Sequence, residues 1–188
     1  MSGSGGTAPS FSPNAFPDTI KVFLFLIQYP GMKIIFGKRN YNKSNKIQSV
    51  DFPISDSAKY LSKKLLRARE TTQRQQLSDD LLDELADMAE INIVKLKISD
   101  AKQYHKKRGG KTVYKQYGYY KPDTQYIYIN NRTAVRGQIL APKTFFDTLI
   151  HEWLHHYDHE KLGLNSIHTS GFYARLKDLK AKLGYFDA

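Results

Sequence analysis

Two histidines and a glutamate stand at a spacing that suits metal chemistry. The segment His151-Glu152-Trp153-Leu154-His155 has the pattern H-E-x-x-H. Residues four apart lie on one face of a helix, so the imidazoles of His151 and His155 can reach one Zn²⁺. Glu152 lies one step round the helix, beside the metal, where it can take a proton from a water molecule on the zinc. The alternative is a pair of surface histidines on an amphipathic helix.

Local signals predict a helix around this motif, from about Phe145 to Leu162. Thr144 and Asp147 have the spacing of a capping box, and Pro142 lies just before them. Gly163 is a natural helix stop. An apolar stripe should face the core, and the motif histidines lie off it, towards a cleft wall. The stripe consists of Phe146, Ile150, Trp153, Leu154 and Tyr157.

A catalytic zinc takes three protein ligands and keeps one position open for water. His159 lies two helical turns from His151, about 12 Å along the axis, and one metal cannot bridge that distance. Asp158 and Glu160 fail for the same reason. His168 follows Gly163 and a short loop, twelve residues after the second motif histidine, and is the candidate third ligand. Its alternative role is a helix-capping or surface residue. The other histidines should be solvated or support the ligands: His105, His156 and His159.

The zinc motif, the twelve-residue gap and the segment His168-Thr169-Ser170-Gly171-Phe172 together resemble the SprT-like metallopeptidases, which include the Spartan DNA–protein crosslink proteases. The segment from Gly118 to Asn130 also looks like the hairpin that precedes the active-site helix in that family. The resemblance covers roughly residues 78–184 and implies His168 as third ligand, with zinc as cofactor. Many members carry a Cys-based zinc ribbon, and this chain departs from them because it has no Cys.

The fold expected from this pattern is α+β, a zincin-like minimal metalloprotease. A small, mostly antiparallel sheet should pack on the H-E-x-x-H helix, with further helices flanking it. An edge of that sheet above the zinc could accept an extended peptide as an added strand, and residues 125–130 are the candidate strand. Their alternative role is simply core sheet.

Periodicity and turn signals divide the chain into three parts. Residues 1–18 are rich in Gly, Ser and Pro and predict a disordered tail or an added linker. Residues 19–55 form an N-terminal extension with a hairpin and a polar loop. Residues 56–188 form the metalloprotease domain that the resemblance implies. The predicted elements are strands at 20–29 and 32–36, a loop at 39–49, helices at 56–70, 78–89 and 170–183, and strands at 91–98, 112–120 and 125–130.

Composition bounds the class of protein. The chain has 188 residues, 40% of them hydrophobic, which suffices for one globular core. The absence of Cys excludes disulfides and thiolate metal sites, and fits a reducing compartment. No apolar run reaches membrane-spanning length, and the pattern of a signal peptide is missing. We therefore expect a cytoplasmic protein with no membrane partner.

The formal net charge is +11, and the positive charge precedes the zinc motif. Residues 91–140 hold eleven Lys or Arg and only two Asp. Within them Lys106, Lys107, Arg108 and Lys111 cluster tightly, with tyrosines interleaved. Cations neutralise phosphates and aromatic faces stack on unpaired bases, which favours binding of DNA or RNA, single-stranded or junction-like, with DNA as the expected partner. A solvated lysine-rich surface, with the tyrosines belonging to strands, explains the cluster equally well.

Three functions remain open. The first is a zinc-dependent endopeptidase with Glu152 as general base, then as acid to the leaving amine. Its substrates, if the resemblance carries over, are proteins near or crosslinked to DNA. The second is a nucleic-acid-binding module with structural or vestigial zinc. The third is a protease with a regulatory protein target and no DNA role. An intact Glu152 and the lack of a Cys as fourth ligand speak against the second.

Overall fold

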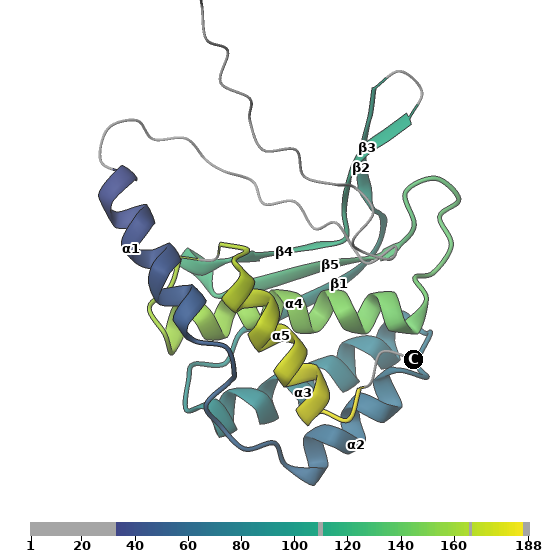
Figure 1. Cartoon of the computed structure of the whole chain (residues 1–188). Helices are drawn as coiled ribbons and strands as arrows, with labels where there is room; N and C mark the ends of the chain where they lie inside the picture. The colour runs from purple at the N-terminus through teal and green to yellow at the C-terminus, as the bar shows by residue number, and fades with distance from the viewer. Residues whose placement is uncertain (1–32, 109–110, 166, 186–188) are drawn as a thin grey trace, which may run out of the picture.

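The computed structural model describes residues 33–185 except 109, 110 and 166. The fold is α+β, with five α-helices, five strands and one 3-10 turn in this part of the chain (Figure 1). The order is α1 (Lys33–Lys46), α2 (Asp56–Leu65), α3 (Thr71–Ala89), β1 (Lys95–Lys102), β2 (Tyr104–Arg108), β3 (Lys111–Gln116), β4 (Gly118–Lys121), η1 (Pro122–Thr124), β5 (Tyr126–Arg132), α4 (Pro142–Glu160) and α5 (Ser170–Lys182).

The main sheet has the strand order β1-β5-β4 and is mixed. β4 and β5 pair antiparallel around η1, which confirms the hairpin expected at this position. β1 and β5 pair parallel, with Leu96 opposite Ile127. The expected mostly antiparallel sheet is therefore wrong for this three-stranded unit. The reason is the connection, since the chain reverses direction twice between β1 and β5, once at β2–β3 and once at β4–β5.

A second, two-stranded sheet is formed by β2 and β3, which project from the body as a hairpin (Figure 1). The single strand expected at residues 112–120 is thus two strands, β3 pairing with β2 and β4 pairing with β5. Arg108 stands opposite Lys111, and Gly109 and Gly110 lie between them in the sequence. Gly-Gly between two strand-like runs is a strong hairpin signal, and it is the sequence feature that separates β2 from β3.

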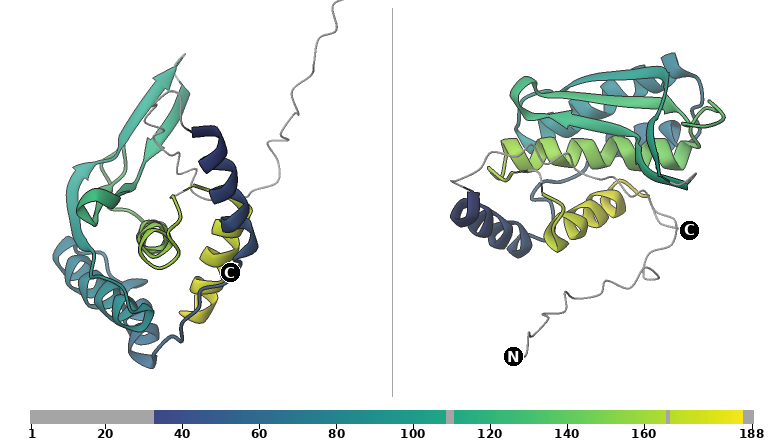
Figure 2. Two further views of the ribbon diagram at one scale, coloured as in Figure 1. Left: turned by 90° about the vertical axis from the view of Figure 1, so that its left-hand side faces the viewer. Right: turned by 90° about the horizontal axis from the view of Figure 1, so that it is seen from above.

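α4 is the central element, with the sheet on one side, α2 and α3 on a second, and α5 with α1 on a third (Figure 2). Every residue from 145 to 158 is buried. Trp153, Phe146 and Tyr157 of the expected stripe are fully buried, and burial of each such side chain contributes roughly 1.5–3 kcal/mol. Because α4 is enclosed on three sides, the position of its functional side chains is fixed by packing.

The ends of the helices differ in part from the expectation. α4 begins at Pro142 with Ala141 as N-cap and no side-chain cap, so the capping box is wrong. Gly163 follows the helix with φ +57°, which agrees with its expected role as a stop. α3 begins at Thr71 rather than at Ser78, which is buried inside it. The first turns of α3 are polar, so no apolar stripe indicates them in the sequence. Their side chains bond to the sheet instead, since the Gln75 side chain accepts from the Ile98 amide at 2.8 Å.

The N-terminal part differs most. The strand expected at 32–36 and the loop at 39–49 are wrong, because residues 33–46 form α1. At the C-terminal end of α1, Ser44 and Asn45 make polar contacts with the N-cap and first turn of α5, which apolar periodicity does not reveal. The strand expected at 20–29 and the tail at 1–18 lie outside the described residues. No described helix has the length and apolar character needed to cross a membrane.

Candidate metal centre

Three imidazoles converge at the middle of α4. His151 and His155, one turn apart on this helix, have Nε2 atoms 3.1 Å from each other. His168 arrives from the segment between α4 and α5, and its Nε2 lies 2.8 Å from that of His151 and 3.1 Å from that of His155. The three predicted ligands are therefore brought together, each by the same ring nitrogen.

The geometry of the three nitrogens fits one metal ion. Nitrogen ligands held at about 2.0–2.1 Å in a tetrahedron lie roughly 3.3 Å apart, close to the observed separations. Burial lowers the pKa of His151 and His155 well below the ordinary value, and it lowers the pKa of His168 to about 4. Neutral imidazole is the form that binds metal. The three buried or half-buried histidines thus lie close enough to hold a metal ion.

Aromatic rings of α5 line the cluster. The ring of Phe172 lies 4.5 Å from that of His155, 5.0 Å from that of His151 and 5.1 Å from that of His168, centre to centre. Tyr173 stacks on His168 at 5.8 Å and is 52% exposed. Phe172 keeps the imidazoles in place on one side, while Tyr173 stands where the site meets solvent. The sequence offered no signal that singled out Tyr173 among thirteen tyrosines.

Glu152 is buried with one of its two carboxyl oxygens unbonded. Its side chain is 2% exposed, and its Oε1 has no hydrogen-bond partner among the residues that the structure describes. Burial raises the pKa of this carboxyl to about 8, against a smaller opposite effect of a hydrogen bond from the Tyr120 backbone. A carboxylate kept at a cost to stability beside a metal cluster is a candidate general base.

Strand β4 lies at the edge of the sheet beside α4. The Asn130 amide donates to the Tyr117 carbonyl at 2.8 Å. In an antiparallel pair, residues that bond to the partner strand alternate with residues whose backbone groups point away from it. The backbone groups of Gly118 and Tyr120 therefore point away from β5. The peptide-binding strand expected at residues 125–130 is therefore misplaced, because β5 is paired on both sides. Among the strands that the structure describes, β4 is the edge strand next to Glu152.

A chain of hydrogen bonds anchors β4 to α4. The Tyr120 hydroxyl lies 3.0 Å from His156 Nδ1, and His156 Nε2 lies 2.7 Å from the Asn92 carbonyl. The carbonyl only accepts, so Nε2 carries the proton and Nδ1 accepts from the hydroxyl. His156 is fully buried and is not part of the metal cluster. Of the two roles expected for it, solvated residue or support of the site, it has the second. His159 is exposed and pairs with Glu160 at 2.9 Å.

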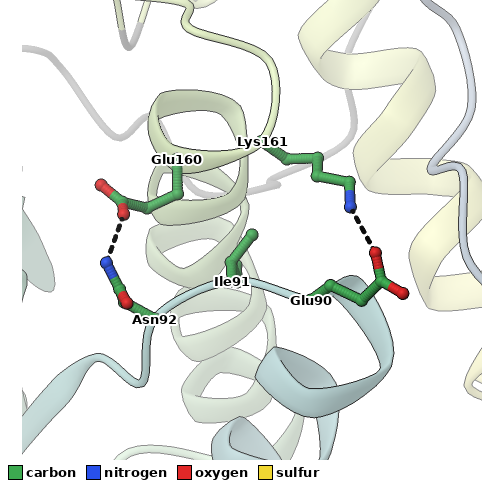
Figure 3. A pocket seen from close by; sticks show the side chains of 5 residues that line it. All are labelled: Glu90, Ile91, Asn92, Glu160 and Lys161. Carbon is green, nitrogen blue, oxygen red and sulfur yellow. Dashed lines mark hydrogen bonds and ion pairs between the residues drawn. The ribbon is translucent and has the colours of Figure 1, made fainter.

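A pocket lies at the C-terminal end of α4 (Figure 3), and none of the three cluster histidines lines it. The Asn92 amide donates to Glu160 at 3.0 Å, and Lys161 pairs with Glu90 at 3.3 Å. These polar groups are bonded to one another across the pocket. We interpret this corner as the contact that fixes the end of α4 to the turn between α3 and β1.

The expected nucleic-acid residues lie apart from the metal cluster. Lys106, Lys107 and Arg108 belong to β2 and Lys111 to β3, in the hairpin that projects from the body (Figure 1). No protein-family model, no curated protein and no solved structure matches this chain. What the site can do therefore follows from the geometry of its own residues.

Proposed function

We propose that the protein is a zinc-dependent endopeptidase. The observation that carries this proposal is the convergence of three Nε2 atoms from His151, His155 and His168, next in the chain to a buried Glu152 whose Oε1 has no partner among the described residues. The described cluster has three imidazoles and no fourth protein ligand, as a catalytic zinc site requires. A structural zinc would normally have four.

Bound zinc would supply a Lewis acid that polarises the scissile carbonyl and lowers the pKa of a bound water molecule, so that this water can lose a proton and attack the carbonyl. Glu152 takes the proton from the attacking water and passes it to the leaving amine. The raised pKa of Glu152, about 8 without a metal, suits an acid that must give this proton back. Tyr173, half exposed beside His168, is the candidate hydrogen-bond donor to the oxyanion.

The substrate chain would bind along β4. The outward backbone groups of Gly118 and the outward carbonyl of Tyr120 can pair with an extended peptide, whereas the Tyr120 N–H already donates to Glu152. A peptide bound there would bring a scissile bond past Glu152. Recognition through backbone groups depends little on sequence. We expect a broad range of protein substrates in an unfolded or extended state.

We further propose a zincin-like, SprT-like protease domain that works on DNA-associated or DNA-crosslinked proteins. The support is the motif His151 to Phe172 together with the basic hairpin β2–β3. Lys106, Lys107 and Arg108 would bind phosphates of single-stranded or junction DNA and hold the enzyme near its substrate.

The test is cleavage of a DNA-binding protein such as a histone by the zinc-loaded chain, with and without single-stranded DNA, beside Glu152→Gln. The proposal expects cleavage that needs Glu152 and is stimulated by DNA. Cleavage that ignores DNA would keep the enzyme and remove the DNA role. No cleavage by a chain with zinc bound would favour a non-catalytic zinc module.

A further inference from the structure

Helix α1 lies against the segment that carries the third histidine, although no α1 residue belongs to the metal cluster. We name residues 161–165 and 167–169, between α4 and α5, the ligand loop. The Asn165 amide donates to the Asn40 side chain at 3.0 Å, and Lys43 donates to the Leu162 carbonyl. The hydroxyls of Ser44 and Thr169 are 2.6 Å apart and buried. α1 therefore contacts the loop at its start, its middle and its end.

Asn45 of α1 also binds the first turn of α5. Its side-chain oxygen accepts from the Ser170 hydroxyl at 2.8 Å and from the Gly171 amide at 3.1 Å. Thr169 is the N-cap of α5, and its hydroxyl accepts from the Phe172 amide. Asn45 thus satisfies a second free amide of the helix terminus, from another helix. This cap lies three residues from His168.

Gly171 allows this contact. A Cβ at this position would lie 1.9 Å from the Ser44 carbonyl oxygen and 2.7 Å from its carbon. Gly171 is inside a helix and its φ is not positive, so its conformation alone does not require glycine. The close approach of α1 is what requires glycine at this position. Glycine in the first turn of α5 costs up to about 1 kcal/mol of helix propensity relative to alanine, which the α1 contact has to offset.

Arg175 ties α1 to the metal helix as well. Its guanidinium forms two hydrogen bonds to Asp158 of α4, at 2.9 and 2.6 Å, with both side chains buried. The same group donates to the Ser44 carbonyl at 2.9 Å and to the Ile47 carbonyl. The segment from Ser44 to Ile47 is therefore fixed against α4 and α5 together.

We infer that α1 is a brace that positions His168, so that the affinity for the metal depends on Asn45, a positioning residue. His151 and His155 are held by α4 itself, whereas His168 lies in a loop and needs external support. The same contacts set the start of α5 and hence Phe172, whose ring touches all three imidazoles. The inference deepens the proposed function, on which it rests for the identity of the metal as zinc.

The experiment compares Asn45→Ala with Asn42→Ala in the full chain. Asn42 is the same residue type on the same helix and is exposed. Zinc affinity is measured by competition with a chromophoric chelator, with circular dichroism to confirm folding. We expect Asn45→Ala to bind zinc about tenfold more weakly, as for the loss of other outer supports of a ligand, and Asn42→Ala to stay within about twofold of the parent. Equal affinity of Asn45→Ala and the parent would overturn the inference.

A double-mutant cycle separates positioning of His168 from general loss of stability. In a His168→Ala background, Asn45→Ala should weaken zinc binding much less than in the parent, because the ligand it supports is gone and only the contacts of Phe172 with His151 and His155 remain. Full additivity would overturn the inference. Asn45→Asp keeps an acceptor at the helix N-terminus, where negative charge is favourable, and should restore the parent affinity and the visible spectrum of the Co²⁺ form.

These readouts do not depend on proteolysis. A chain that binds zinc with coupled Asn45 and His168 but cuts no protein would support the brace and refute the proposed function. If the chain cuts protein and Asn45→Ala does not change its zinc affinity, the proposed function would be supported and the brace refuted. A chain that binds no zinc would overturn both.

Discussion

Replacing Glu152 with Gln should make the metal-free protein more stable at neutral pH. The Glu152 carboxyl is 2% exposed, and burial raises its pKa from 4.5 to about 8. Gln has nearly the same shape as the protonated acid but never has to ionise. At neutral pH the folded parent therefore has to keep Glu152 largely protonated although the unfolded chain ionises it, a cost in free energy that the variant lacks.

The sign and size follow from linkage between protonation and folding. A pKa raised on folding gives stability that is fully present below pH 4.5 and is lost as the pH rises through 8. A tenfold difference between the acid constants of the folded and unfolded states corresponds to about 1.4 kcal/mol. The parent should therefore lose about 3 kcal/mol by pH 7 and about 5 kcal/mol above pH 8, relative to Glu152→Gln. For a domain of this size, about 3 kcal/mol is roughly 6–12 °C in Tm.

The assay is urea unfolding of both proteins in excess chelator at about pH 5, 6, 7 and 8. The pKa values of His151, His155 and His168 are lowered on folding, so their contribution has the opposite sign and is lost as the pH falls. It is common to both proteins and cancels in the difference. The free energies of unfolding should differ by less than about 1 kcal/mol at pH 5 and diverge as the pH rises. Parallel pH curves would show that Glu152 is not a buried, destabilised acid.

Three other substitutions address the remaining parts of the site. His168→Ala should weaken zinc binding by more than the roughly 100-fold typical of outer supports, measured by chelator competition; unchanged affinity would mean another third ligand. Reversing the charges of Lys106, Lys107 and Arg108 should reduce the slope of log K against log salt for single-stranded DNA by about 2, and an unchanged slope would remove the hairpin from DNA binding. Tyr173→Phe should keep zinc affinity and lower kcat by about 100-fold, whereas an unchanged kcat would exclude the hydroxyl as oxyanion donor.

The parts of the site that depend on local spacing could be predicted from the sequence. His151 and His155 share a helix face because of the helical repeat, and Gly163 ends that helix so that His168 can fold back. The convergence of the three nitrogens agrees with that prediction. The last helix, expected from residue 170 to 183, runs from Ser170 to Lys182.

The parts that depend on distant partners could not be predicted. The end of α1 gave no helix signal, because the contacts of Ser44 and Asn45 with the start of α5 are polar. The parallel pairing of β1 with β5 follows from reversals elsewhere in the chain. β4 is an edge strand and β5 is not, because β5 lies between β1 and β4. The alternation of apolar and polar residues along a strand does not reveal the order of strands in a sheet.

The most direct test of the proposed zinc site is a crystal structure of the zinc-loaded protein with anomalous data at the zinc edge. We predict one zinc within about 2.1 Å of Nε2 of His151, His155 and His168, with a water molecule in the fourth position that contacts Glu152. Zinc at another place, or a fourth protein ligand that closes the site, would contradict the proposal.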